Sequence, residues 1–379
     1  MLSTRTFIVL FSLLAVLASF LLASSTRSTI AIVGSASGSD AYRRIVNLLA
    51  SPFRTQVSST PPRMTIPTTQ ELEAFWTKAL DELPSTPDNI PAFFFGHGSP
   101  ILAYPASAAK GLGEFAAYQG PTGPLYRFLK QFGPTLLKKY QPKAIVVFSA
   151  HWETYRERLV TDYGDENPLL MDYYGFPPDL YKLKFKSRGD STLAKRLVEL
   201  YQRAGQKARL TPASEARGED GRGFQGPGLD HGVFVPFRIM FGEEFTSIPV
   251  VQVSIDASLD PEKNWQVGKV VSELRKEGAL VLSGGLTAHN LGDRTSFSPV
   301  TARPAHKEFD AAIHRAINVK DSDARKKALF DLTRHPGFRA SQPREDHFVP
   351  LYVAAGAGEG GEVKTIVNAY GIPTFAFGL

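Results

Sequence analysis

Residues 143–150 read KAIVVFSA, a short run of β-branched and aromatic residues that closes on small ones. Runs of this length and composition are typical of buried strands. Four further runs of the same kind follow or precede it: PAFFF (91–95), IPVVQVSI (248–255), ALVLSGG (279–285) and IPTFAFG (372–378). The sequence therefore predicts at least five buried strands after residue 90.

Between these runs lie stretches whose apolar residues recur at helical spacing. The predicted helices are Leu125–Tyr140, Thr192–Ala204, Trp265–Glu277, Ala305–Ile317 and Ala324–Phe330. Strands that alternate with helices predict an α/β fold, here a single domain with a central, largely parallel or mixed sheet flanked by helices. We expect this domain to span residues 91–379. Two segments are predicted to be surface loops: Ala106–Pro124, which is rich in Gly, Ala and Pro, and Pro212–Gly228, which is Gly-rich and charged.

The N-terminal part has a different character. Residues 1–30 form an apolar segment, and residues 31–90 form a Ser/Thr/Pro-rich linker for which short helices are predicted at Ala41–Leu49 and Gln70–Leu83. Thr68 and Thr69 are the candidate cap residues of the second helix.

The apolar segment is long enough to suggest a membrane function. Between Arg5 and Arg27 no residue is charged, and Phe7–Ala23 reaches the lower limit of about 17 residues for a membrane-spanning helix. We therefore expect a single N-terminal membrane anchor. A secretory signal that is cleaved near Ala23, or a mitochondrial presequence, is the alternative.

Charge and composition exclude several classes of function. The formal net charge is +6, but residues 1–67 contain six Arg and one acidic residue, Asp40, so that the rest of the chain carries only +1. The sequence has no basic stripe or zinc-finger spacing that would indicate binding to nucleic acid. Because it has no Cys, disulfides, Cys-ligated metal centres and a thiolate nucleophile are excluded.

Three of the eight histidines lie just past predicted strands. His97 follows AFFFG, His151 follows AIVVFSA, and His289 follows ALVLSGGLTA. In open α/β sheets, ligands bind outside the carboxyl ends of the strands. Glycine, serine and alanine surround all three histidines, and such small residues let the backbone approach a ligand closely. The sequence therefore predicts a metal site at the C-terminal ends of the strands.

The other histidines fall into two groups. His231 and His347 lie in turn-like segments, LDHGVFVPF and REDHFVPLY, that precede apolar helices. His306 and His314 are expected on the solvated face of a helix, and His335 in a polar turn. An imidazole-rich site suits zinc, iron, copper or nickel, and three His or two His with a carboxylate suit non-haem Fe(II) or catalytic zinc.

Six segments carry a family resemblance. They are GHGSP (96–100), SAHWE (149–153), YGFPPDLY (174–181), LDHG (229–232), SGGLTAHN (283–290) and DHFVPL (346–351). In this order they resemble the class III extradiol ring-cleavage dioxygenases, and most closely the single-chain 4,5-DOPA extradiol dioxygenase branch. The resemblance covers residues 91–379.

The resemblance implies a role for each of these histidines. His97, His151 and His347 would be the ligands of a ferrous ion, and zinc is also described in this site of related proteins. His289 would be the acid/base residue or a fourth ligand when zinc is bound, and His231 would contact substrate or dioxygen. Glu345 and Asp346 stay open as members of the metal shell, because other class III enzymes use a carboxylate as third ligand.

The expected function is Fe(II)-dependent extradiol opening of a catechol, with a DOPA-like compound as the candidate substrate. A catechol must lose protons to chelate a metal, and a histidine can accept one at neutral pH. Tyr173, Tyr174 and Phe176 either line an aromatic pocket or pack their own turn. The alternatives are a zinc hydrolase, with His289 or Glu153 as the base, and a non-catalytic metal-binding relative.

Overall fold

Eight strands form one mixed sheet in the computed structural model, which describes residues 66–86, 88–217 and 226–379. The strand order is β5-β3-β7-β2-β8-β1-β10-β9. The strands are β1 (Ala92–Gly96), β2 (Ala144–Thr154), β3 (Arg158–Asp162), β5 (Ala208–Pro212), β7 (Val250–Asp256), β8 (Ala279–Gly285), β9 (Val363–Val367) and β10 (Thr374–Phe377). A two-stranded sheet pairs β4 (Lys186–Ser187) with β6 (Glu244–Phe245).

The centre of the large sheet is parallel. The neighbouring pairs β7–β2, β2–β8 and β8–β1 are all parallel, whereas β10 is antiparallel to both β1 and β9. The carboxyl ends of four adjacent strands therefore meet at one edge. This arrangement confirms the predicted α/β domain with a mixed sheet, and all five strands expected from the sequence are present.

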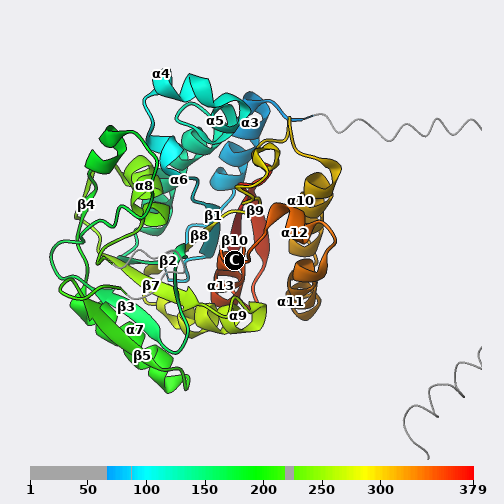
Figure 1. Ribbon diagram of the computed structural model, residues 1–379. Coiled ribbons are helices and arrows are strands. Elements are labelled where there is room, and N and C mark those ends of the chain that lie inside the picture. The colour runs from blue at the N-terminus through cyan, green and yellow to red at the C-terminus, as the bar shows by residue number, and fades with distance from the viewer. Residues whose placement is uncertain (1–65, 87, 218–225) are drawn as a thin grey trace, which may run out of the picture. The chain divides into compact units, whose positions relative to one another are not determined.

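Helices cover both faces of the sheet (Figure 1). On one face, α3, α6 and α8 pack on side chains such as Phe93 and Phe95 of β1. On the other, α7, α9, α10, α11, α12 and α13 share a core with Phe94 and Phe375. Their bounds are α3 (Thr69–Asp81), α6 (Pro124–Tyr140), α7 (Ser191–Arg203), α8 (His231–Phe241), α9 (Pro261–Val270), α10 (Pro304–Ile317), α11 (Ser322–Asp331), α12 (Phe338–Ser341) and α13 (Pro350–Ala357).

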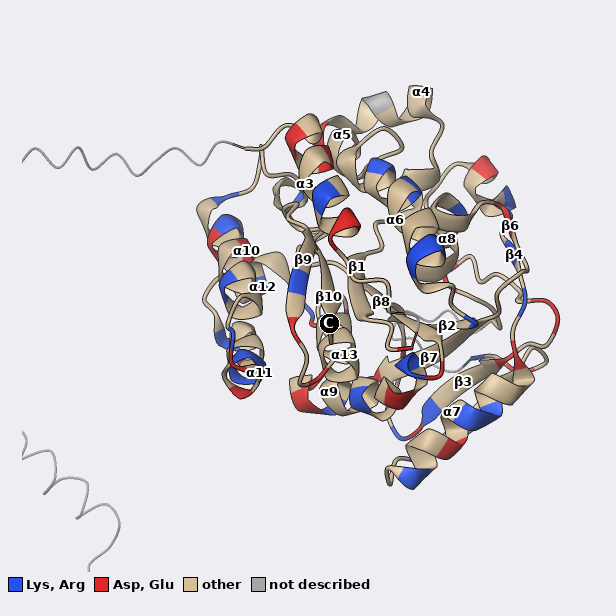
Figure 2. Ribbon diagram, turned by 180° about the vertical axis from the view of Figure 1, so that it is seen from behind, with Lys and Arg blue, Asp and Glu red and all other residues tan. Residues whose placement is uncertain are grey.

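Charge lies on the outside of these layers. Figure 2 shows Lys and Arg interspersed with Asp and Glu on the outer helices, while the central strands are almost entirely uncharged. β1 and β8, for example, are buried over their whole length. The continuous apolar runs of the sequence are therefore explained by strands that bury both faces.

Helix α3 extends the domain beyond the boundary that the sequence suggests. Thr68 and Glu71 form a capping box at its N-terminus, worth about 1 kcal/mol. Its buried residues, Leu72, Trp76 and Leu80 among them, belong to the core under α6, and the compact unit spans Thr65–Leu379. The helix predicted at Gln70–Leu83 thus packs as a part of the domain.

The segment predicted as a loop at Ala106–Pro124 is partly helical, and this prediction is wrong. It contains α4 (Ala106–Ala109) and α5 (Gly113–Gln119). The glycines and alanines of this segment indicate a loop, but Ala116 and Gln119 of α5 are buried, so that one face of this helix packs on the domain. Of the second predicted loop, residues 218–225 lie outside the described residues.

As far as the described residues show, the prediction of a membrane-spanning helix is also wrong. None of the helices there is both long and apolar enough to cross a bilayer, which takes about 20 apolar residues. Even α6, with 17 residues, has an exposed face and carries Lys138 and Lys139 in its last turn. The predicted anchor Phe7–Ala23 and the predicted helix Ala41–Leu49 lie outside the described residues.

Candidate metal centre

The carboxyl ends of β1 and β2 carry two of the predicted histidines to one place. β1 ends at Gly96, and His97 follows at once; Gly98 then takes a φ of +71°, which an L side chain rarely adopts. His151 lies inside β2, which runs on to Thr154, and the register between β2 and β7 shifts after Phe148. Such an irregularity re-aims side chains at the end of a strand.

His347 reaches the same place from the segment before α13. Its carbonyl accepts a hydrogen bond from the backbone N–H of Leu286, just past β8, at 2.9 Å. A Cβ on Gly285 would lie 2.4 Å from that carbonyl oxygen, so only glycine permits this close approach. The absence of a side chain at Gly285 therefore lets the His347 segment lie against the end of β8.

The ring nitrogens of His97, His151 and His347 lie within 4.8 Å of one another, and all three side chains are buried. The two Nε2 atoms of His151 and His347 are only 3.0 Å apart. The Nε2 atom of His97 is buried without a hydrogen-bond partner. Burial, followed by the neighbouring His347, His231 and His289, lowers the pKa of His97 well below its usual value, so this ring is neutral at pH 7.

The opposite nitrogen of each ring has a hydrogen-bond acceptor. Nδ1 of His97 bonds the carbonyl oxygen of Gly98 at 2.7 Å, and Nδ1 of His347 bonds Asp346 at 2.9 Å. Nδ1 of His151 bonds Asp172 at 3.1 Å. Each Nδ1 is therefore placed to donate its proton, and in that tautomer Nε2 is the atom that each ring would present to a metal.

This arrangement fits a bound metal ion. Two lone pairs that face each other at 3.0 Å repel, and a cation between them turns the repulsion into coordination. Histidine ligands in metal sites regularly donate the other ring N–H to a carboxylate or a carbonyl oxygen. Two further groups of possible ligands, His151 with Asp172 and His231, and His289 with Asp346 and His347, share residues with this one.

The sequence leaves open whether Glu345 or Asp346 belongs to the metal shell, and the two carboxylates differ in position. Asp346 is buried, and its bond to His347 places it behind that ring. Burial alone would raise the pKa of Asp346, but His347, His289 and Arg344 outweigh it and hold the pKa below its usual value. Glu345 instead forms an ion pair with Arg339.

Asp172 is a site residue that the sequence did not reveal. Its Oδ1 accepts both Nδ1–H and the backbone N–H of His231 at 2.8 Å, while Oδ2 accepts from His151. Burial would raise the pKa of Asp172, but the charges and hydrogen bonds of the two histidines lower it well below the usual value. One ionised carboxylate therefore orients two imidazoles.

A buried ion pair supports this cluster from below. Arg217 and Asp230 are both fully buried and lie 3.0 Å apart. Asp230 also accepts from Ser149 at 2.7 Å and Gln252 at 2.6 Å, and Arg217 donates to the carbonyl oxygen of His151 at 3.0 Å. The segment predicted as a surface loop at Pro212–Gly228 thus contributes Arg217, which holds the backbone of a candidate ligand.

A cavity of about 500 Å³ opens beside this cluster. Its polar lining is formed by His151, His231, His289 and His347 with Asp172 and Asp346, and the rest of its wall is largely apolar. The wall residues are Gly98, Ser99, Pro100, Phe115, Gln119, Tyr173, Tyr174, Phe176, Leu286, Leu291 and Phe297. Tyr173, Tyr174 and Phe176 therefore line the cavity, and Tyr173 also packs its own turn by donating to the carbonyl oxygen of Leu180.

The remaining two predicted site residues, His289 and His231, also line the cavity. The ring of His289 stacks on that of His347, with centroids 3.4 Å apart and planes at 14°, and it is only half-buried. The ring centroid of His231 lies 4.0 Å from that of His151. All five histidines named from the sequence are thus found together.

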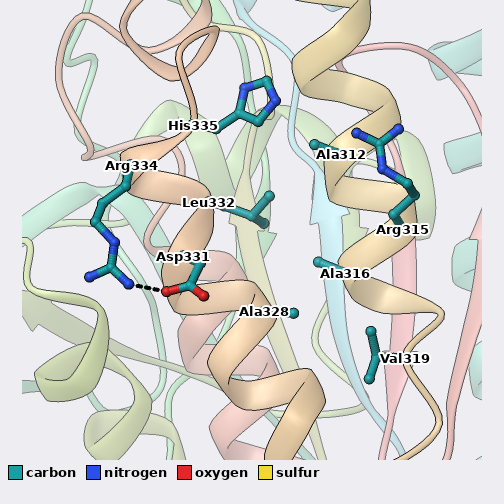
Figure 3. A pocket seen from close by; sticks show the side chains of 9 residues that line it. All are labelled: Ala312, Arg315, Ala316, Val319, Ala328, Asp331, Leu332, Arg334 and His335. Atoms are coloured by element: carbon teal, nitrogen blue, oxygen red, sulfur yellow. Dashed lines mark hydrogen bonds and ion pairs between the residues drawn. The ribbon is translucent and has the colours of Figure 1, made fainter. Parts of the chain in front are cut away.

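The other three histidines lie elsewhere. His306, expected on a solvated face, is buried between Ser341 and Asp293, so this expectation is wrong. A second hollow, of about 480 Å³, lies between α10 and the end of α11 and is lined by His335 (Figure 3). Its floor is made of small apolar side chains, and Arg334 at its rim pairs with Asp331.

Comparisons with known proteins identify the family. A family model described as the catalytic LigB subunit of aromatic ring-opening dioxygenase matches residues 91–379. A 4,5-DOPA dioxygenase extradiol-like protein of Schizosaccharomyces pombe is 41% identical over 305 residues, which are 80% of this chain and 97% of that protein. The 4,5-DOPA dioxygenase extradiol of Beta vulgaris is 30% identical over 285 residues, 75% of this chain and 93% of that protein.

Among solved structures, that of an uncharacterized protein from Escherichia coli K12 has a TM-score of 0.52 and 24% sequence identity, covering 76% of this chain and 100% of that chain. This likeness shows the shared fold. The family model and the relatives confirm the resemblance that the six sequence segments indicate: the chain belongs to the family of the catalytic LigB subunit of aromatic ring-opening dioxygenases.

Proposed function

We propose that the protein is a non-haem Fe(II)-dependent extradiol dioxygenase, which opens the ring of a catechol with dioxygen. One observation carries the proposal. Three imidazoles bring their ring nitrogens within 4.8 Å of one another beside a cavity with aromatic walls, and two more histidines line that cavity. Its volume of about 500 Å³ suits a small aromatic ligand.

The proposed ligands are His97, His151 and His347. A ferrous ion there would supply adjacent open positions at which a catecholate and dioxygen meet. Asp172 and Asp346 hold two of the rings in the tautomer that ligation requires, and the carbonyl oxygen of Gly98 does so for the third. The donor set contains no thiolate, because the chain has no Cys.

His289 is the proposed proton acceptor for the catechol. Its ring lines the cavity, and its stacking on His347 fixes its orientation next to a candidate ligand. An imidazole has a pKa near about 6.5, which is suited to accept a hydroxyl proton at neutral pH and to return it later.

His231, whose ring lies next to that of His151, is the second residue proposed to move a proton. Because its Nδ1 is bonded to Asp172, Nε2 is the atom with which it accepts or donates a proton at the cavity. In its protonated form, the ring would stabilise negative charge that develops on the oxygen substrate.

The relatives support the reaction type. Several carry the name 4,5-DOPA dioxygenase extradiol, and the family description names aromatic ring opening. These names concern the related proteins, and they favour the same class of reaction for this chain.

The proposal is tested by loading metal-free protein anaerobically with one equivalent of Fe(II) or of Zn(II) and adding catechols and oxygen. Oxygen uptake and a yellow ring-opened semialdehyde are expected with the Fe(II)-loaded protein and not with the Zn(II)-loaded protein. Uptake with neither metal, over a broad panel of catechols, would refute the proposal. Activity without oxygen in the zinc form would point to a hydrolase instead.

A matched pair of variants links this activity to the site. His151→Ala removes a proposed ligand, so both bound iron and oxygen uptake should be lost. His335→Ala changes a histidine in the separate hollow of Figure 3, and iron content and uptake should stay at the level of the unmodified protein.

A further inference from the structure

A second hollow at the carboxyl edge of the sheet has a volume of about 530 Å³. β2 ends at Thr154 and β7 at Asp256, which face each other in the register of these parallel strands. Asp256 and the turn that follows β2 line the hollow together with the turn after α7 and one side of α9, two helices that contact each other (Figure 1). Ligands of open α/β sheets bind outside the carboxyl ends of the strands, so the hollow lies where this fold forms binding sites.

The lining of this hollow has an excess of positive charge. Its basic side chains are Arg156, Arg158, Lys207 and Lys263. The two acidic residues of the lining already pair with cations, since Asp256 lies 3.1 Å from Arg158 and Glu262 lies 3.3 Å from Lys326. The exposed side chains of Arg156, Lys207 and Lys263 therefore make the hollow attractive to an anion.

Arg158 differs from the other three cations because it is buried, with an exposed fraction of 3%. Its Nη2 donates to the carbonyl oxygen of Thr154 at 2.5 Å and to Asp256 at 3.1 Å. Its Nη1 is buried and has no hydrogen-bond partner in the described part of the chain. Burial lowers the pKa of Arg158, and the charge of Asp256 offsets this only in part. An anion in the hollow would supply the compensation that this guanidinium lacks, in surroundings where water screens charge weakly.

An aromatic ring lies beside these cations. Tyr155 lines the hollow although it is 71% exposed. A flat ring of a ligand can stack on such a side chain. The amide of Gln206, which can both donate and accept hydrogen bonds, also lines the hollow. The volume lies within the range of about 300–1,000 Å³ that is usual for small-molecule sites, so the hollow has room for one small ligand.

We propose that this hollow binds a small ligand in which phosphate groups are joined to a flat ring, as in a nucleotide. The phosphates would lie at Arg156, Lys207 and Lys263, which suit phosphate as exposed cations. The flat ring would stack on Tyr155. The site is independent of the proposed dioxygenase reaction, because its lining residues are separate from those that line the cavity beside the metal centre.

Calorimetric titration of the metal-loaded full chain with adenosine diphosphate, pyrophosphate and adenosine, in a buffer without Mg²⁺, tests the proposal. Adenosine diphosphate should bind about fivefold or more tightly than pyrophosphate, because stacking of a base on an aromatic side chain contributes at least this factor. Adenosine should bind about tenfold or more weakly than the diphosphate, because it lacks the charged groups. The proposal is overturned if adenosine diphosphate shows no binding up to about 1 mM, or if pyrophosphate binds equally well.

Two charge reversals locate the bound phosphates. Arg156→Glu and Lys263→Glu lie on different elements of the lining, and each should weaken adenosine diphosphate binding by roughly three- to tenfold. Lys320→Glu is the matched control, because Lys320 is exposed and lies outside the lining, and it should change binding by less than about twofold. Equal losses in the control and in the two lining variants would show that the ligand does not bind in this hollow.

A second pair of variants locates the flat ring. Tyr155→Ala should weaken adenosine diphosphate binding by about fivefold or more and leave pyrophosphate binding unchanged. Phe75→Ala is the matched control, because Phe75 is a 43% exposed aromatic residue outside the lining. If Tyr155→Ala binds adenosine diphosphate as Phe75→Ala does, the ring does not stack where we propose.

The metal centre is the competing site, because phosphate groups also bind metal ions. His97→Ala removes a proposed metal ligand and should bind adenosine diphosphate within about twofold of the unmodified protein. Circular dichroism checks that each variant is folded. Loss of binding in folded His97→Ala would place the ligand at the metal centre and overturn the proposal.

Discussion

Replacing Asp172 by asparagine should weaken metal binding although Asp172 is not among the three proposed ligands. In the native site, Oδ1 accepts two N–H groups of His231 and Oδ2 accepts Nδ1–H of His151. Asparagine keeps one acceptor oxygen and presents an NH₂ group in place of the other. The oxygen is expected to stay with His231, which offers two donors, so that the NH₂ group faces His151.

The consequence for His151 follows from its tautomer. Facing an NH₂ donor, Nδ1 must become the acceptor, and the proton moves to Nε2, the atom that lies 3.0 Å from Nε2 of His347. Loss of such a partner behind a ligand lowers metal affinity by about 10- to 100-fold, which corresponds to about 1.4–2.8 kcal/mol.

The assay is an anaerobic competition for Fe(II) or Zn(II) between the protein and a chromophoric chelator. Asp179→Asn is the matched control, because Asp179 is exposed and its ion pair among the described residues is with the exposed Lys182, at 3.2 Å. Thermal unfolding followed by circular dichroism checks that both variants fold. If Asp172→Asn binds the metal within twofold of the unmodified protein, the account of how Asp172 orients His151 is wrong.

Three further predictions concern other parts of the domain. Arg217→Met should lower the free energy of unfolding in urea by about 3–5 kcal/mol, because it leaves Asp230 buried without its cation; the exposed Arg203→Met should change it by less than about 1 kcal/mol. Burial raises the pKa of Asp310 to about 7, so its ionisation opposes folding as pH rises toward 7, and the stability advantage of Asp310→Asn should grow between pH 4 and 7 by up to about 1.4 kcal/mol per unit and then level off; an advantage that is constant over this range would contradict the assignment. His289→Ala should keep one bound metal per chain and lose turnover by about 10²- to 10⁴-fold, and normal turnover would remove His289 from the mechanism.

The sequence predicts the strands of this domain well because they are buried on both faces and read as continuous apolar runs. The residues that follow β1 and β8 could therefore be placed at one edge of the sheet before the structure was known. His347 and His231 were harder to place from strand pattern alone. His231 begins α8 and His347 precedes α13, and the resemblance of their segments to the family identifies them.

There is a physical reason why the sequence does not predict Asp172 and Arg217, the residues that hold the candidate ligands in place. Asp172 lies 21 residues beyond His151 and 59 before His231, so its role depends on contacts between distant segments. Arg217 lies in a Gly-rich, charged stretch whose composition indicates a loop, yet the side chain is fully buried against Asp230. His306 was misassigned because its neighbours on the helix are charged, whereas the ring itself turns to Ser341.

The central claim is that three imidazoles hold a metal at which a catechol is opened by dioxygen. The most direct test uses ¹⁸O₂ with the Fe(II)-loaded protein and mass spectrometry of the ring-opened product of a neutral 4-alkylcatechol. We predict one O₂ consumed per catechol and both ¹⁸O atoms in the product, with no incorporation in the His97→Ala variant. A product that forms without ¹⁸O, or incorporation that survives in His97→Ala, would contradict the account.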